Sequence, residues 1–375
     1  MKRVLDNRDC FKRTDEGFDS AQPDTKWWLS LSKPLPFFNY SPEKRYQLVK
    51  QLIFILAFLI SHIAFLTSQT ILPTAESAFE SQLPFNQAFI QNQNIKSITF
   101  DIIDKKDLQV AEDKGLLNEY EFNTHGKLTR FYYTSIIKTI QKEYHAEAVY
   151  NHRRKIRNGY SYTKNEYVYD TVSTTYLYND NQQLKMKRYN DGTFYEANYY
   201  DYNSDGKVEK EKRYKETNVS ENKSEFKLGA QFPISEESFK YQLINKNQYK
   251  KIHLNDEGRT YKEVIYNLNN DQKPTSINEQ YTVTWITQQS TFTYNQKGQL
   301  LSATYKSNSN GDLEKVITYE YDANDCLYAE KHYKNGVLQK EISYVTDTNK
   351  KLTSYIIRDP ANKTIRIVKL IYKYN

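Results

Sequence analysis

Residues that contain sulfur or break regular structure are scarce in this chain of 375 residues. It has two cysteines, two methionines, eleven glycines and nine prolines. Cys10 and Cys326 cannot form a disulfide framework, and we interpret Cys326 as a structural residue. The low glycine content and a mean hydropathy of −0.84 argue against a compact α/β enzyme core.

A strong excess of charge of one sign is also missing. The whole chain carries +7, but residues 70–375 contain 43 Lys or Arg against 39 Asp or Glu. That excess is too thinly spread for a nucleic-acid-binding stripe, so we expect no nucleic-acid partner. One basic cluster, "HRRKIR" at 152–157, is interpreted as a solvated turn or strand edge, with an anionic contact patch as the alternative.

Motifs that carry catalysis or bind cofactors are absent as well. The six histidines lack metal-ligand spacing, and no nucleophile elbow, Walker loop or dinucleotide fingerprint occurs. Carboxylates are plentiful, but on strands with one wet face they are normally solvated. We therefore expect no cofactor and no catalytic residue, and we interpret the protein as a non-enzyme.

The chain has one long apolar run, "LIFILAFLISHIAFL", at Leu52–Leu66. A basic segment precedes it and small residues follow, which is typical of a secretory signal peptide at 49–69. A retained single membrane anchor is the alternative, although 15 residues are short for a span of about 20. Residues 1–48 then would not be made, with translation starting at Val49, or would be disordered, and 70–94 would be a polar linker.

Tyrosine, by contrast, is abundant, with 34 residues, and many of them recur in one frame. The frame reads aromatic, any, aromatic, Asn or Asp, two variable residues, Gly or a polar residue, any, aliphatic. Its copies are "EYEFNTHGKL" (119–128), "TYLYNDNQQL" (175–184), "YYDYNSDGKV" (199–208), "TFTYNQKGQL" (291–300) and "TYEYDANDCL" (318–327). The repeat predicts a chain of similar hairpins.

Shorter Asn-Gly and Asp-Gly turns lie between these copies and indicate tight hairpins. Turn centres at 298, 311, 325 and 336 are spaced for an antiparallel meander of strands about eight residues long. Alternation places Ile317, Tyr319 and Tyr321 on one face and charged or polar residues on the other. In the same way, Leu301 is expected to share a face with Ala303.

The frame Y-x-Y-(N/D)-x-x-G-x-L resembles the YD repeat of bacterial Rhs-type envelope and secreted proteins. The resemblance covers roughly 119–355, and an irregular insertion is expected near 218–250. It lacks the Rhs core with its self-cleavage motif, because "RDPANK" at 358–363 matches poorly, and no toxin-like domain follows. The resemblance implies a repeat architecture and an exported location, but no activity.

These features predict an all-β fold over 95–375, an antiparallel meander of about twenty strands. A sheet that wide curls, splits or closes. We expect a curled sheet or half-shell with the tyrosines inside, following an N-terminal apolar helix.

One copy of the frame resembles a calcium loop. Asp201, Asn203 and Asp205 alternate before Gly206, and Glu209 follows. The twelfth position, where such a loop places a bidentate acid, is Lys212. Because the same polar pattern recurs in other copies as turn residues, we prefer a structural turn to a weak calcium site.

We therefore expect an exported, non-catalytic protein located in the periplasm, at the outer surface or in the medium. Its role would be structural or would consist of binding an envelope or extracellular protein or glycan. Solvent-facing tyrosines such as Tyr328 would matter more than any carboxylate, and membrane contact would occur only through Leu52–Leu66 if uncleaved. The alternative is an enzyme, or the shell fragment of a secreted toxin system, with its chemistry in the 218–250 insertion.

Overall fold

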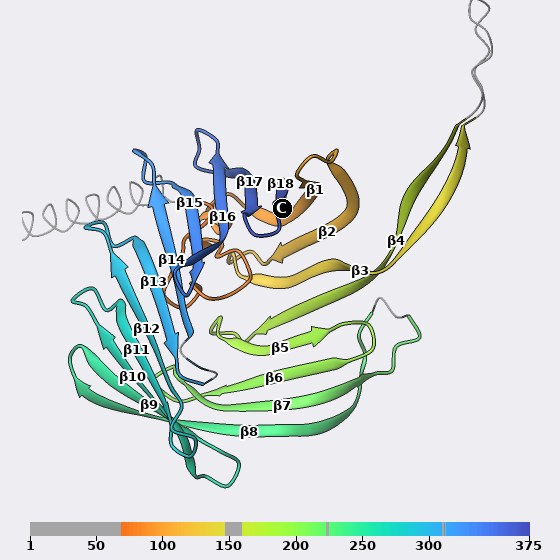
Figure 1. The fold of residues 1–375 in the computed structure, drawn as a ribbon. Coiled ribbons are helices and arrows are strands. Elements are labelled where there is room, and N and C mark those ends of the chain that lie inside the picture. Colours follow the sequence, from red (N-terminus) through yellow and green to blue (C-terminus); the bar gives the residue numbers. More distant parts are fainter. Residues whose placement is uncertain (1–68, 147–159, 223–224, 310, 312) are drawn as a thin grey trace, which may run out of the picture. The chain divides into compact units, whose positions relative to one another are not determined.

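The computed structural model describes residues 69–146, 160–222, 225–309, 311 and 313–375, and these form one antiparallel sheet of 18 strands (Figure 1). The apolar stretch 52–66, the segment 1–48 and the basic cluster at 152–157 lie outside the described residues. Among the helices of the described part, none is long and apolar enough to cross a membrane.

The strands follow the chain as a meander whose turns alternate between two rims. In order they are β1 (Ile95–Lys106), β2 (Glu112–Phe122), β3 (Leu128–Ala146), β4 (Tyr160–Tyr178), β5 (Leu184–Asn190), β6 (Tyr195–Tyr202), β7 (Val208–Asn218), β8 (Leu228–Asn245), β9 (Gln248–Leu254), β10 (Thr260–Leu268), β11 (Pro274–Tyr281), β12 (Thr287–Tyr294), β13 (Leu300–Ser307), β14 (Leu313–Tyr321), β15 (Leu327–Lys334), β16 (Val337–Thr346), β17 (Leu352–Asp359) and β18 (Thr364–Tyr374). One short helix, α2 (Gln87–Asn92), precedes β1.

The sheet closes on itself, so the predicted open, curled sheet or half-shell is wrong. Strand β1 pairs with β2 on one side and with β18 on the other, through eleven opposed residue pairs from Ile95↔Tyr374 to Lys106↔Thr364. Every strand therefore has two neighbours, and the fold is an 18-stranded antiparallel β-barrel. Closure satisfies the backbone groups that a free edge would leave unpaired. The predicted N-terminal apolar helix is not part of the described structure.

The repeated frame forms seven similar turns at one rim of the barrel. In each turn the Asn or Asp side chain accepts hydrogen bonds from backbone N–H groups of the same turn. Asn203, for example, accepts from Asp205 and Lys207, both at 3.0 Å. The fourth residue of each turn has a positive φ, and at 126, 182, 206, 298 and 325 it is the Gly-or-polar position of the repeated frame. The structure adds Gln272 and Lys350, whose copies are weaker in sequence.

A β-bulge follows each of these turns, and it shifts the alternation of the next strand by one residue. The unpaired residues are 129, 185, 209, 275, 301, 328 and 353. Leu301 is therefore 38 % exposed, whereas Leu300 and Ala303 are buried. The predicted pairing of Leu301 with Ala303 on one face is wrong for this reason.

The second aromatic residue of the frame links neighbouring turns along the rim. Its tyrosine hydroxyl donates to a backbone carbonyl at the aliphatic position of the preceding turn. The pairs are Tyr178 to Leu128 (2.8 Å), Tyr202 to Leu184 (2.8 Å), Tyr294 to Pro274 (2.7 Å) and Tyr321 to Leu300 (3.0 Å). Tyr241 and Tyr372 make the same contact with Val208 and Leu352. This bond requires a tyrosine hydroxyl, which phenylalanine lacks.

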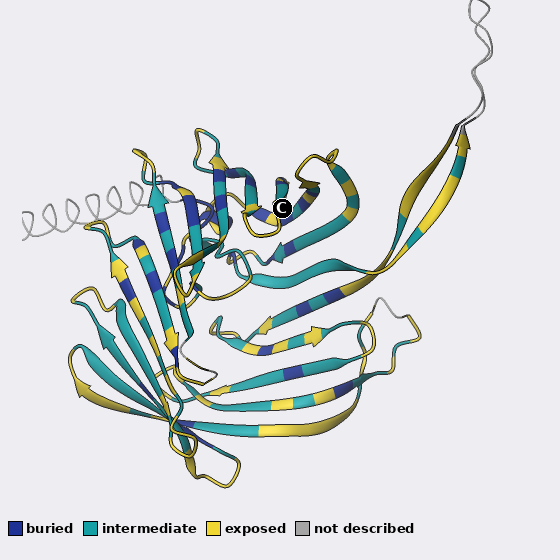
Figure 2. Ribbon diagram, in the orientation of Figure 1, coloured by how far each residue is buried: buried dark blue, intermediate teal, exposed yellow. Residues whose placement is uncertain are grey.

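The two faces of the sheet differ in polarity. The inward face is mostly apolar and aromatic over β12–β18 and β1–β2, where Figure 2 shows most of the buried residues; Phe100, Ile317, Tyr319 and Val368 are examples. The outward face carries cross-strand ion pairs such as Lys306–Glu314 (3.0 Å). Cys326 is buried, as expected of a structural residue.

Residues 69–94, which the sequence marked as a polar linker, pack against the inward face. Phe85 contacts the rings of Tyr120 and Phe122 on β2, and Phe79 contacts Tyr305 on β13. The Asn86 side chain caps α2, whose Phe89 and Ile90 are buried. A barrel of this strand number encloses more space than its own side chains fill, and this segment occupies part of it. We call residues 69–94 the inner segment.

Two regions depart from short, even strands. From Thr134 onward in β3, and up to Val172 in β4, the two strands pair only with each other in the backbone ladder, so they extend past their neighbours as a two-stranded ribbon (Figure 1). The suggested insertion near 218–250 is mostly regular, because β8 and β9 cover most of it. Its irregular part is the loop between Asn218 and Leu228.

Candidate functional site: an interior basin

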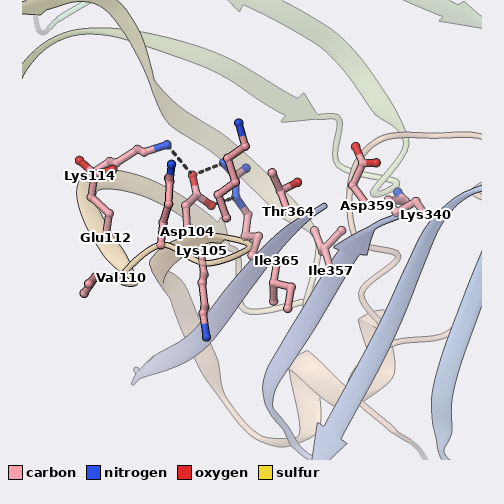
Figure 3. A pocket seen from close by; sticks show the side chains of 13 residues that line it. Asp104, Lys105, Val110, Glu112, Lys114, Lys340, Ile357, Asp359, Thr364 and Ile365 are labelled. Atoms are coloured by element: carbon pink, nitrogen blue, oxygen red, sulfur yellow. Dashed lines mark hydrogen bonds and ion pairs between the residues drawn. The ribbon is translucent and has the colours of Figure 1, made fainter. Parts of the chain in front are cut away.

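Two cavities lie on the inward face near the rim opposite the seven repeated turns. The larger has a volume of about 470 Å³ and is lined by residues of β1, β2, β16, β17, β18 and the loops beside them (Figure 3). The smaller, about 310 Å³, lies between β14–β16 and residues 78–81 of the inner segment. Lys340 lines both. We call the two cavities together the interior basin.

An ion-pair network forms one wall of the larger cavity. Arg366 donates two hydrogen bonds to Asp104, at 2.7 and 3.0 Å, and the Lys114 ammonium lies 3.4 Å from the same carboxylate (Figure 3). The hydrogen bond from Arg366 lowers the pKa of Asp104; burial opposes this, but the charges of Arg366 and Lys114 add to the lowering. Asp104 is therefore a fixed anion, and Lys105 extends away from this group.

A second polar group lies on β15 and β16, on the same inward face as Lys340. The Glu330 carboxylate is buried, with one oxygen bonded to His332 and the other accepting from the Tyr344 hydroxyl at 2.7 Å. Burial acts to raise the pKa of Glu330, but the hydrogen bond and charge of His332 and the bond from Tyr344 hold it below its ordinary value. Glu330 is thus a satisfied carboxylate.

Lys340 is the half-buried cation of the basin that no contact neutralises, whereas the other lining cations without an ion pair, Lys105, Lys106, Lys315 and Lys334, are exposed. It opposes His332 across β15 and β16 and is half-buried. It forms no ion pair or hydrogen bond with any other described residue. Burial lowers the pKa of Lys340, and the more distant charge of Glu330 opposes that shift.

The sequence analysis did not single out these residues, although the sequence contains a sign of them. Lys340 falls in the same alternation phase as Ile342 and Tyr344, which are buried on the inward face. A lysine in an apolar phase is informative, because charged side chains are seldom turned towards a core without a partner. Nothing in the sequence indicates that Lys340 shares a cavity with residues of β1 and β18, because closure of the sheet brings the two ends of the domain together.

The residues proposed for metal binding serve other contacts. Asn203 bonds its own turn, and Asp201 lies 3.2 Å from the Lys212 ammonium. Asp205 is exposed. No group of three potential metal ligands occurs among the described residues. The preference for a structural turn over a weak calcium site at Asp201, Asn203 and Asp205 stays a prediction.

Tyr328 lies where a solvent-facing tyrosine was expected. It occupies a bulge position, its side chain is 44 % exposed, and its hydroxyl donates to Glu320 at 2.7 Å on the outward face. Its role in binding a partner stays a prediction.

Comparisons with known proteins give no family. No family model matches the chain, and no curated protein matches it. A porin-like protein from Bacteroides uniformis ATCC 8492 is 10 % identical, with 74 % of this chain and 98 % of that one covered and a TM-score of 0.31. A porin-like protein from Bacteroides vulgatus ATCC 8482 is 8 % identical, with coverages of 75 % and 98 % and a TM-score of 0.29.

A TcdB2-TccC3 structure is also similar, at 10 % identity. The match covers 68 % of this chain and 16 % of that one, with a TM-score of 0.24. Similarities this distant decide neither family nor function. The resemblance to YD-repeat proteins therefore stays a prediction.

Proposed function

We propose that this protein is an exported, non-catalytic binding protein whose closed sheet holds the interior basin as its ligand site. The observation that carries the proposal is the set of charged side chains that three distant chain segments direct into the larger cavity. Barrel interiors are stabilised by apolar packing, and charges placed there cost free energy unless they are paired or used. Volumes of about 470 and 310 Å³ suit a small molecule or the end of a glycan.

Binding fits these groups better than proton transfer does. A general acid or base works best with a pKa near the working pH. The carboxyl groups of Asp104 and Glu330 are instead held below their ordinary pKa values by their partners. They stay ionised and positioned, which supports recognition of a ligand by fixed charges.

Export is the second part of the proposal. It is supported by the basic and apolar pattern of 49–69. The outward face of the barrel carries ion pairs such as Lys331–Glu320 at 2.6 Å, whereas strand faces in contact with lipid are apolar. We therefore expect the barrel's outer surface to be in water, with membrane contact limited to Leu52–Leu66 if that stretch is retained. Cell fractionation that finds the intact 44.5 kDa chain in the cytosol would contradict export.

The binding proposal is tested by filling each cavity with a bulky side chain. Thr364→Trp fills the larger cavity, and Ser81→Trp fills the smaller one from an exposed position. Sugars and small metabolites are screened by the shift in melting temperature that they cause in the purified protein. We expect ligands that stabilise the parent to lose this effect in at least one variant. Equal stabilisation of the parent and both variants would place the site elsewhere.

A further inference from the structure

We propose that the interior basin binds a small carboxylate whose anionic group pairs with Lys340 and whose apolar body fills the smaller cavity beside Phe79. The inference rests on the proposed function, because it assigns a ligand class to the same basin.

The charges that line the basin favour an anion. Its walls contain seven Lys or Arg and four Asp or Glu. Two of the cations, Lys114 and Arg366, are already bonded to Asp104. The cations that remain outnumber the remaining anions, so the basin attracts negative charge.

Within that set, Lys340 is the side chain best placed to receive the anion. It lies at the junction of the cavities, and its ammonium lacks an ion-pair partner among the described residues. Glu330 does not supply one, because His332 and Tyr344 already bond both of its oxygens. A half-buried cation without a partner is costly, and a ligand carboxylate would remove that cost.

The smaller cavity determines the rest of the ligand. Besides lysines, its wall contains Ala78 and Phe79 of the inner segment and Ile317 and Tyr333 of the sheet. Such a wall gains free energy by covering an apolar chain or ring. A ligand that reaches from Lys340 into this cavity therefore combines one charged end with an apolar body.

The experiment measures binding of octanoate, octan-1-ol and octylammonium to the whole protein by isothermal titration calorimetry. These probes share one apolar chain and differ in the charge of the head group. We expect octanoate to bind most tightly and octylammonium least. Lys340→Met should weaken octanoate about ten-fold or more, because a charge-assisted bond is lost. Lys340→Arg should largely restore affinity, and the exposed Lys369→Met serves as the matched control that leaves it unchanged.

Each outcome separates this inference from the proposed function. If octanoate binds Lys340→Met as well as the parent but not Ser81→Trp, the basin binds ligands and the role of Lys340 is wrong. Octan-1-ol binding as tightly as octanoate, or no binding of octanoate, would overturn the carboxylate inference alone. Octanoate binding equally to Ser81→Trp, Thr364→Trp and Lys340→Met would overturn both. Circular dichroism of each variant verifies that it is folded.

Discussion

At the scale of the residue, the recurring tyrosines have a structural purpose that composition alone does not show. Each hydroxyl of the rim tyrosines bonds a carbonyl beside the neighbouring turn, as Tyr321 does with Leu300. The side chains thus link successive repeats, in addition to the backbone ladder between strands. Tyrosine fits this position because its ring is half-buried while its hydroxyl reaches a polar partner.

Tyr321→Phe should therefore destabilise the protein. Removing the hydroxyl leaves the Leu300 carbonyl without this donor, which costs about 1–2 kcal/mol when the site is shielded from water. Urea unfolding followed by tryptophan fluorescence measures the difference. Tyr328→Phe is the control: its hydroxyl bonds Glu320 at an exposed position, so the change should stay within about 0.5 kcal/mol. Equal costs at the two positions would contradict the rim role.

A histidine on the inward face of β9 makes stability depend on pH. Burial, with the charges of Lys262 and Lys251, lowers the pKa of His253 to about 3. Its Nδ1 lies 3.5 Å from Glu237 but has no well-formed hydrogen bond there. The folded state therefore keeps this imidazole neutral where the unfolded chain, with a pKa of about 6.5, takes up a proton.

Above about pH 6.5, His253 is neutral in both the folded and the unfolded state, so it does not lower the free energy of unfolding. Between about pH 6.5 and 3, only the unfolded chain binds the proton, so the free energy of unfolding should fall as the pH falls. His253→Gln should flatten the decline in unfolding free energy over that window. Denaturant titrations at a series of pH values measure it, with the exposed His125→Gln as the control. A decline equally steep in His253→Gln and in the parent would show that other groups cause it.

At the scale of the element, the inner segment has a role that its polar sequence conceals. It contributes Ile71, Ala75, Ala78, Phe89 and Ile90 to the same core as the strands. Leu327 N–H donates to the Gln69 side chain at 2.7 Å, which ties the start of the segment to β15. The segment also supplies one wall of the smaller cavity, so packing and the binding site depend on the same residues.

Ile90→Ala tests this packing. Ile90 is fully buried, and truncating such a side chain costs about 2–5 kcal/mol through lost burial and a residual cavity. Leu72→Ala, in the same segment but at a side chain that is 39 % exposed, should cost less than about 1 kcal/mol. Chemical denaturation of both variants gives the comparison. A cost for Ile90→Ala no larger than for Leu72→Ala would mean that the segment is not packed inside.

At the scale of the whole molecule, closure is the decisive feature. A meander of hairpins needs only contacts between neighbours in sequence. The pairing of β1 with β18 joins residues about 270 positions apart, and it brings Asp104 to Arg366. The basin therefore exists only in the closed sheet.

A cross-strand disulfide tests closure directly. Asp101 and Lys369 oppose each other on β1 and β18, and both are exposed. Opposed residues of antiparallel strands lie about 4.5–5.5 Å apart, within the range of a disulfide. In a background with Cys10→Ser and Cys326→Ser, Asp101→Cys with Lys369→Cys should oxidise and raise the melting temperature. A bridge over so long a loop can stabilise by up to about 5 kcal/mol. Failure to oxidise under conditions that oxidise a surface pair within one hairpin would favour an open sheet.

The sequence by itself determined the features that depend on neighbouring residues. Alternation and turn chemistry predicted an all-β meander, the positions of five repeated turns and the aromatic inward face with Tyr319 and Tyr321. These are local because a turn needs only its own Asn or Gly, and a strand only its period of two. The bulge at Leu301 could not be predicted from alternation, because it depends on the register with the partner strand.

Only the tertiary structure decided closure, the place of the inner segment and the interior basin. Each is a contact between residues far apart in sequence: β1 with β18, Phe85 with Tyr120, and Lys340 beside the wall of Asp104 and Arg366. Pairing the last free edges and filling the enclosed space lower the free energy of the whole sheet rather than of any one repeat. No single hairpin sequence contains that information.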